Sequence, residues 1–318
     1  MNKEKLIRSF IDLDKLPLQT IRNLDYAEYA FSEYGVLEDW NKFTNYIESR
    51  FGDIEKYNKY YSEVKESFMT YVKNLPEYRV FNTQDMSRFS FQFPPNVSKG
   101  NQYSEEHSGK TMLSIDLKKA NFQALKWCGV FPEDIKTYED LISKFTDVSF
   151  LIHSKYLRSV VFGQLNPGRH ITVESYLINM IRPEISDRLK LICMASDELI
   201  YEVPKDIIIL HSELEGTKQE IKQKYGLEIS AEYYKLNEYI LEAEKSHKQY
   251  RIYAKESLTG EETKYKCIPN NLYLMFWKLK TGREVCDYDR WVEHDGILSM
   301  YIENFNLYKY EKTVSNKN

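Results

Sequence analysis

Two aspartates lie where strand-like segments end, and their residue type and placement could support metal-dependent phosphoryl transfer. Asp116 comes near the end of the apolar run 111–117, and Asp197 lies in a short polar corner between the runs 189–193 and 199–203. Because these runs are rich in Ile, Leu, Tyr and Val, the second segment predicts a β-hairpin with Asp197 in its turn. Carboxylates beside buried strands need partners, and a divalent cation is a common one.

We expect Asp116 and Asp197 to converge at one end of an antiparallel sheet and to bind two Mg²⁺ ions, which prefer oxygen ligands. In two-metal chemistry, one ion activates an attacking hydroxyl and the other holds triphosphate oxygens and the leaving group. Glu198 would be a further ligand or would orient a water. The alternative is that Asp116 caps a helix beginning at Leu117 and that Asp197 and Glu198 lie in an ordinary solvated turn.

Composition restricts the class of protein without identifying it. The chain has 318 residues and a net charge of −4, so any contact with nucleic acid must come from local basic clusters. Its four cysteines are scattered without CxxC spacing, which argues against a zinc ribbon or a disulfide framework and favours a reducing, cytoplasmic setting. The sequence has no apolar run of membrane-spanning length, so we expect a soluble protein without a membrane partner.

The pattern of apolar residues predicts helices first and strands later. Residues 1–75 have the spacing of packed helices with a break at Gly52-Asp53, and their rings are interpreted as core. Residues 76–110 predict a loop. The further predicted helices are 120–129, 138–146, 154–161, 173–181, 206–225 and 272–279, and the further predicted strands are 227–234, 250–254 and 263–268, the last two joined around Leu258-Thr259-Gly260.

The order of these segments resembles that of template-dependent nucleic-acid polymerases with a right-hand palm domain. Residues 114–120, SIDLKKA, are similar to polymerase motif A, the strand-to-helix segment that holds the first metal-binding aspartate. Residues 196–204, SDELIYEVP, resemble motif C of family A DNA polymerases, in which HDE precedes an apolar strand. Residues 155–163, KYLRSVVFG, are similar to the fingers-helix pattern KxxxFG with Arg158 in place of Lys, and Lys248-Gln249-Tyr250 resembles the KxY element of family B.

The sequence also departs from both families. Ser196 stands where family A has His, and the second motif C aspartate of family B would fall on Leu199 or Ala195. The short spacing between motifs A and C implies reduced fingers. Residues 1–110 lack the acidic DxE pattern of an exonuclease domain, so we expect no proofreading within this chain.

The resemblance implies a role for three basic residues. Lys155, Arg158 and Arg169 would neutralise the incoming triphosphate, with Arg suited to bidentate phosphate contacts. Lys155 and Arg158 are three residues apart and therefore share one face of the predicted helix. The alternative is an ordinary solvated basic helix face.

The resemblance also implies contacts with primer and sugar. Lys248 and Tyr250 would contact the primer or template strand, although a solvated edge strand protected by its charges would look the same. Asn121 lies five residues past Asp116, where DNA polymerases usually carry a side chain that excludes a ribose 2′-hydroxyl. Because Asn is small and can donate and accept hydrogen bonds, we expect tolerance or preference for ribonucleotides, unless Asn121 simply faces solvent.

The sequence therefore predicts an α+β polymerase with a helical accessory region and linker (1–110), a palm with reduced fingers (111–235), and a palm completion with a thumb-like region (236–318). The predicted reaction is Mg²⁺-dependent extension of a primer with nucleoside triphosphates on a DNA template, or alternatively an RNA template. Primer-template and nucleoside triphosphates are the expected partners, joined by DNA-replication proteins, in a phage or mobile-element context. The alternatives are a catalytically inactive polymerase-like subunit that binds nucleic acid or a partner, and a purely structural interaction protein.

Overall fold

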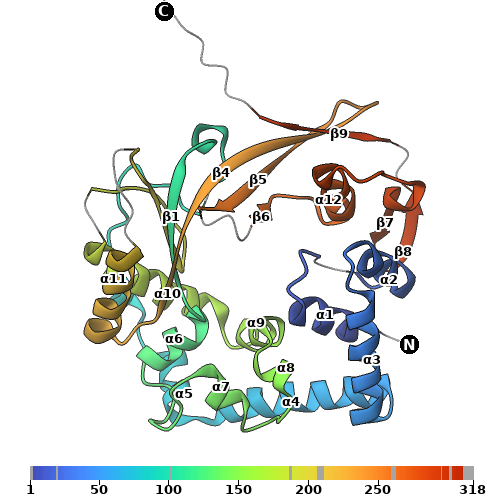
Figure 1. Cartoon of the computed structure of the whole chain (residues 1–318). Helices are drawn as coiled ribbons and strands as arrows, with labels where there is room; N and C mark the ends of the chain where they lie inside the picture. The colour runs from blue at the N-terminus through green and yellow to red at the C-terminus, as the bar shows by residue number, and fades with distance from the viewer. Residues whose placement is uncertain are drawn as a thin grey trace, which may run out of the picture.

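The N-terminal region is helical, as the spacing of its apolar residues predicts. Its helices are α1 (Glu4–Leu13), α2 (Leu24–Glu33), α3 (Leu37–Phe51), α4 (Ile54–Asn74) and α5 (Pro76–Thr83). The computed structural model describes residues 3–18, 21–100, 102–185, 188–205, 211–258, 263–294, 296–300 and 303–310. Figure 1 shows these helices along one side of the molecule, with the large sheet on the other.

The predicted helix break is confirmed, and the predicted aromatic core is confirmed except at Tyr46. Gly52 has a φ of 88°, a left-handed conformation that suits glycine, and the Asp53 side chain then accepts a hydrogen bond of 2.7 Å from the backbone N–H of Lys56. Of the rings within residues 32–74, those of Trp40, Phe43 and Phe68 are buried, and Trp40 packs edge-to-face against Phe10 with the centroids 5.2 Å apart, whereas Tyr46 is 43% exposed. Helix packing, rather than ligand binding, thus accounts for these rings.

The loop predicted over 76–110 is wrong in its first part, which forms α5. Pro76 occupies the first turn of that helix, where its missing N–H costs nothing, and Tyr78 and Phe81 are buried on its inner face. The described residues of 84–110, which exclude 101, are irregular apart from the short 3₁₀ turns Ser87–Phe89 and Glu105–His107 and an isolated β-bridge from Ser98 to Cys193.

The segment between the two predicted aspartate sites is mostly helical, as expected. Its helices are α6 (Ala120–Trp127), α7 (Tyr138–Ile142), α8 (Ser149–Ile152), α9 (Lys155–Gly163) and α10 (Pro167–Ile181). The last of these begins earlier than predicted because Asn166 adopts a left-handed conformation (φ 54°) and Pro167 then starts the helix. The turn predicted at residues 166–168 is therefore a helix entry.

A seven-stranded antiparallel sheet brings the aspartate-bearing strands together. Its strands are β1 (Thr111–Leu117), β2 (Lys190–Met194), β3 (Glu198–Glu202), β4 (Ile229–Ala243), β5 (Gln249–Ser257), β6 (Thr263–Lys266) and β9 (Phe305–Lys309). The order is β2-β3-β1-β4-β5-β6, and β9 pairs with the distal part of β4. The predicted hairpin is confirmed as β2 and β3, whereas β4 runs well past the predicted end at residue 234 because it also pairs with β5 and β9.

Both faces of this sheet carry a buried apolar cluster, and one of them also carries charged side chains. Leu113 and Ile115 of β1 are buried on the face covered by α6, α10 and α11 (His211–Tyr225), which lie together beside the sheet in Figure 1. Residues 206–210, where the helix was predicted to begin, lie outside the described residues. Because side chains alternate along a strand, Ser114 and Asp116 lie on the opposite face, which we call the charged face.

The C-terminal region closes the molecule against the N-terminal helices. The predicted helix 272–279 is confirmed as α12 (Tyr273–Thr281), but the strands β7 (Trp291–His294) and β8 (Ile297–Met300), and also β9, were not predicted. The buried Lys278 ammonium lies 2.9 Å from Asp289 and 3.0 Å from Glu33 of α2, which ties α12 to the N-terminal region. Thr259 and Gly260 of the predicted turn lie outside the described residues.

Within the described ranges, no helix is both long and apolar enough to cross a membrane.

Candidate active site

The register between β1 and β3 brings the three predicted catalytic carboxylates together. Asp116 lies opposite Glu198, and the backbone N–H of Leu117 donates to the carbonyl of Asp197 at 2.9 Å. Directly opposed residues in an antiparallel pair have Cβ atoms about 5 Å apart. Asp116, Asp197 and Glu198 therefore belong to one site, although 81 residues separate Asp116 from Asp197 in the chain.

Asp116 belongs to a strand and does not cap a helix. Strand pairing of β1 with β4 continues to Leu117, and α6 begins at Ala120, after Lys119 turns the chain in a left-handed conformation (φ 53°). Glu198 likewise belongs to β3. The helix-cap alternative is thus wrong for Asp116, and the solvated-turn alternative is wrong for Glu198.

Burial and mutual repulsion make these carboxylates costly to ionise. Burial, followed by the charges of Asp197 and Glu198, raises the pKa of Asp116 to about 7 from an ordinary 3.8, while Lys155 and Lys255 partly oppose the shift. Burial also raises the pKa of Asp197. Within the described part of the chain, no hydrogen bond or ion pair reaches the Asp116 carboxylate, so a cation bound there would find a poorly compensated oxygen donor.

A buried glutamate that the sequence analysis missed lies beside them. Glu174 of α10 is only 3% exposed, and its carboxylate accepts a hydrogen bond from the side-chain amide of Asn121. Burial, together with the charges of Asp197 and Asp116, raises the pKa of Glu174 to about 7. The available signal was a lone acidic residue in an otherwise uncharged stretch of α10, on the same helix face as the buried Leu177 and Ile178.

The bond from Asn121 to Glu174 fixes the orientation of the Asn121 amide. Because the Glu174 carboxylate accepts a hydrogen bond from the side-chain N–H of Asn121, the Asn121 amide is held against α10 rather than rotating freely in solvent. The solvent-facing alternative for Asn121 is therefore wrong, while its expected influence on sugar choice stays a prediction.

Lysines approach the same carboxylates from the sheet and from α9. Lys255 of β5 is 7% exposed, and its ammonium lies 3.4 Å from Glu198. Lys155 opens α9, which the Ser154 side chain caps by accepting from the backbone N–H of Leu157 at 2.9 Å. The positive charge of Lys155 is close enough to favour ionised Asp116 and Asp197. Lys155 was predicted from the sequence, whereas Lys255 was not.

Arg158 and Arg169 make their contacts elsewhere. The Arg158 guanidinium lies 5.7 Å from the centre of the Tyr138 ring. Arg169 donates to the carbonyls of Phe81, at 2.9 Å, and Gln84, which end α5. These contacts give Arg169 a structural role in holding α5 against α10.

Lys248 and Tyr250 lie at the distal end of the β4–β5 ribbon. Tyr250 pairs with Leu241, whereas Asp116 pairs with Ser230, so about 35 Å of strand separates the two positions at the usual rise per residue. The Lys248 ammonium lies 4.9 Å from the centre of the Tyr250 ring. The structure thus does not bring these two residues beside the carboxylates.

Few side chains at this site could serve as metal ligands. Among the described residues, no group of three or more His, Cys, Asp or Glu side chains is arranged to hold a metal ion. Asp116 and Asp197 offer hard oxygen donors that suit Mg²⁺, which commonly completes its coordination with substrate phosphates and water. The donor chemistry thus fits an ion that arrives with a phosphate-bearing ligand.

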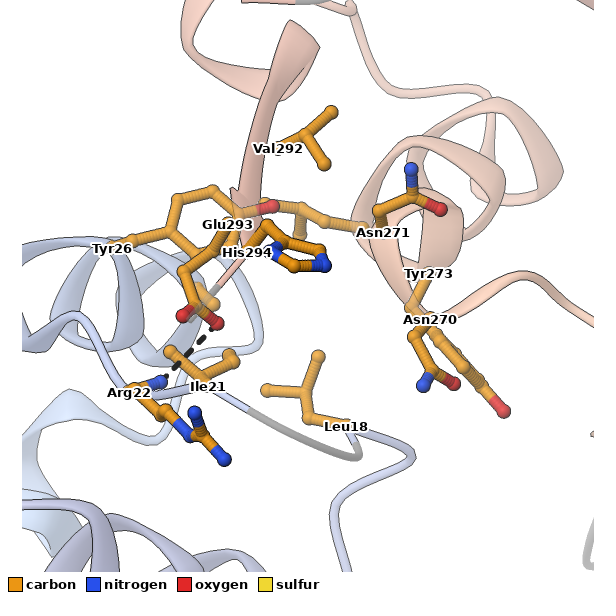
Figure 2. A pocket seen from close by; sticks show the side chains of 12 residues that line it. Leu18, Ile21, Arg22, Tyr26, Asn270, Asn271, Tyr273, Val292, Glu293 and His294 are labelled. Carbon is orange, nitrogen blue, oxygen red and sulfur yellow. Dashed lines mark hydrogen bonds between the residues drawn. The ribbon is translucent and has the colours of Figure 1, made fainter. Parts of the chain in front are cut away.

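A separate cavity of about 320 Å³ lies between the N-terminal helices and β7. Figure 2 shows Asn271 and His294 among its lining side chains, and the backbone N–H of Arg22 donating to Glu293 at 3.2 Å. Tyr26 of α2 also lines it. None of the residues predicted to act in catalysis lines this cavity, so its chemistry is separate from that of the carboxylates.

Comparison of the chain with protein-family models, with curated proteins and with solved structures finds no match. Any functional assignment therefore depends on the geometry and chemistry of these residues.

Proposed function

We propose that this protein is a template-dependent nucleotidyltransferase that extends a primer with nucleoside triphosphates. The observation that carries the proposal is the meeting of Asp116, whose carboxylate is poorly compensated, and Asp197, whose carboxylate accepts a hydrogen bond of 3.2 Å from the Ser196 hydroxyl, at one end of an antiparallel sheet with lysines beside them. Strand β1 followed by α6 would correspond to motif A, and the β2–β3 hairpin to motif C. In this proposal residues 111–235 are the palm with reduced fingers and residues 236–318 complete it.

The proposed reaction is attack of the primer 3′-oxygen on the α-phosphorus of the triphosphate. An O–P bond forms, the bond between the α-phosphorus and its bridging oxygen breaks, and pyrophosphate leaves with that electron pair. Mg²⁺, when bound, would favour loss of the hydroxyl proton and would neutralise phosphate charge. Asp116 and Asp197 would hold the metal, and the Asn121–Glu174 pair, which lies close enough for the charges of Asp197 and Asp116 to raise the pKa of Glu174, would contact the nucleotide sugar.

In this proposal, Glu198 acts mainly as the charge partner of Lys255 rather than as a metal ligand. Its carboxylate accepts a hydrogen bond of 2.5 Å from the Ser114 hydroxyl and pairs with Lys255. A carboxylate with two such partners is largely compensated. It would therefore hold Lys255 in place beside the Asp116 carboxylate.

A primer-extension panel tests the proposal. Full-length protein with Mg²⁺ would be given DNA or RNA templates, with deoxynucleotides or ribonucleotides, alongside Asp116→Asn, Asp197→Asn and the surface control Asp134→Asn. Extension by the wild type and the control, with loss of at least about a hundredfold in the other two, supports the proposal, since each removes a proposed metal ligand. Extension unchanged in Asp197→Asn, or absent under every condition, would overturn it.

Sugar choice forms a separate arm of the panel. Because Asn121 leaves more room than Glu and is held by Glu174, we expect ATP to be incorporated opposite a matched base at least as well as dATP. A strong preference for dATP would refute this expectation without touching the nucleotidyl-transfer proposal.

The second candidate is a catalytically inactive subunit that keeps the fold. It is favoured by the small ligand set among the described side chains and by Ala195 and Ser196 at the hairpin turn. This candidate predicts nucleic-acid or partner binding with no turnover under any nucleotide pool. The same panel, read together with a binding assay, separates the two.

A further inference from the structure

Three lysines from distant parts of the chain gather beside the catalytic carboxylates. On the sheet, Lys255 of β5 lies opposite Lys264 of β6, and Lys266 follows Lys264 two residues later. Lys255, Lys264 and Lys266 therefore lie on one face of the sheet. Lys255 pairs with Leu236 of β4, and Tyr234, two residues before Leu236, pairs with Met112 of β1. Directly opposed residues share a face, so Lys255 lies on the same face as Met112 and Asp116, which is the charged face. Lys155 of α9 approaches from outside the sheet. We call Lys155, Lys255 and Lys266 the lysine group.

Positive charge in the lysine group exceeds the negative charge paired with it. Lys264 has its own partner, Glu232, at 3.3 Å, and Lys255 pairs with Glu198 at 3.4 Å while its ammonium lies 4.6 Å from the centre of the Tyr234 ring. For Lys155 and Lys266, in contrast, the described part of the structure contains no ion pair.

The lysines also repel one another. Burial, followed by the charges of Lys255 and Lys155, lowers the pKa of Lys266, and Glu198 only partly offsets this. Lys155 and Lys266 are exposed, whereas Lys255 is 7% exposed, so the group presents positive charge to solvent, where a ligand with several negative charges would bind favourably.

We infer that the lysine group is an oligophosphate site that holds the β- and γ-phosphates of the nucleotide substrate and then the pyrophosphate product. The inference rests on the proposed function for the identity of the substrate. It places this site mainly on strands β5 and β6, whereas the family resemblance implied Lys155, Arg158 and Arg169. Lys155 is shared by both.

The neighbouring carboxylates explain why an oligophosphate fits better than a simple anion. Asp116 and Asp197 would repel a bare carboxylate or chloride, but with a Mg²⁺-chelated triphosphate the aspartates would hold the metal and the lysines would bind phosphate oxygens. As the α–β bond breaks, the new charge on pyrophosphate develops on the side nearest the lysine group, while the hydroxyl proton leaves to solvent. The lysines would therefore favour the departing group electrostatically.

Inorganic tripolyphosphate tests this site without requiring turnover. Its binding to the full-length protein would be measured by isothermal titration calorimetry with Mg²⁺, for the wild type, Lys266→Gln, Lys266→Glu and the control Lys222→Gln, whose lysine pairs with Glu228 on the surface at 2.7 Å. Loss of one charge-assisted contact predicts about tenfold weaker binding for Lys266→Gln and a larger loss for Lys266→Glu. The Lys222→Gln control should stay within about twofold of wild type.

The outcomes separate this inference from the proposed function. Tight tripolyphosphate binding that depends on Lys266, with no primer extension, supports the oligophosphate site and overturns the polymerase proposal. Primer extension with unchanged nucleotide KM in Lys266→Gln, and no tripolyphosphate binding, overturns the site alone. Binding of a single-stranded oligonucleotide that depends on Lys266, with no binding of tripolyphosphate, would also overturn it, because the lysines would then contact a nucleic-acid backbone. Thermal melts of each variant confirm folding, and a Lys266→Gln protein that melts like wild type yet binds tripolyphosphate equally well would refute the inference.

Discussion

Replacing Asp116 by Asn should make the metal-free protein more stable at neutral and alkaline pH. The Asp116 carboxylate is partly buried beside Asp197 and Glu198, and its ionisation in the folded state is therefore unfavourable. Asparagine has nearly the same shape but carries no charge. If Asp116 binds a cation in the functional protein, its carboxylate destabilises the metal-free protein, and Asp116→Asn should remove that destabilisation.

The size of the effect follows from the pKa of Asp116, which rises from 3.8 in the unfolded chain to about 7 in the folded protein. Each unit corresponds to about 1.36 kcal/mol, so the full shift would be about 4 kcal/mol. Because the carboxylate is partly solvated and interacts with Asp197, we reduce this to about 2 kcal/mol. The folded state binds the proton more tightly, so stability is lost as the pH rises from about 4 to about 7 and is constant above that range.

The assay is urea denaturation of wild type and Asp116→Asn in EDTA at several pH values between 5 and 8. The stability difference in favour of the variant should grow with pH and level off near pH 7. Adding Mg²⁺ should then stabilise the wild type and leave the variant unchanged, since only the wild type retains the ligand. Asp134→Asn, whose exposed carboxylate pairs with Lys144 at 3.1 Å, is the matched control and should show neither effect.

Two results would refute this reasoning. The first is a variant less stable than wild type at pH 8 in EDTA, which would mean that the carboxylate is well compensated in the free protein. The second is a stability difference that does not change with pH, because a charge-based penalty must follow the titration of Asp116.

The remaining predictions concern other buried groups. Lys278→Ala should lower the free energy of unfolding by about 3–5 kcal/mol, since it leaves the fully buried Asp289 carboxylate without its cation, and a loss under about 1 kcal/mol in urea would contradict this. Glu174→Gln keeps an acceptor for Asn121 but removes a buried charge whose pKa is about 7, so the metal-free variant should gain stability at pH 8 and gain little at pH 5 in the same assay. Phe68→Ala should cost about 3–5 kcal/mol by thermal or chemical denaturation because the ring is 0% exposed, and a cost under about 1 kcal/mol would show that the helices repack around the cavity.

Local sequence patterns predicted the strands that carry or flank Asp116 and Asp197. The apolar runs around Asp116 and Asp197 could be recognised as strands because each run buries its own side chains and is bounded by polar residues. The N-terminal helices were predicted for a similar reason, since their apolar spacing matches one helix face. Where a segment gains its structure from a distant partner, as β9 does from β4, the local pattern was too weak, and the hairpin of β7 and β8 was missed although these two strands pair with each other.

The amino-acid sequence by itself determined that two acidic residues end or turn strands, and that lysines and aromatic rings follow them. Only the tertiary structure decided which charges share a site. Glu174, Lys255 and Lys266 join Asp116 there, while Arg169 packs against α5, because helix packing and strand register, rather than nearness in the chain, set these distances. A charged residue on an otherwise apolar helix looks the same in sequence whether it faces solvent or a buried carboxylate, and long-range pairing makes that choice.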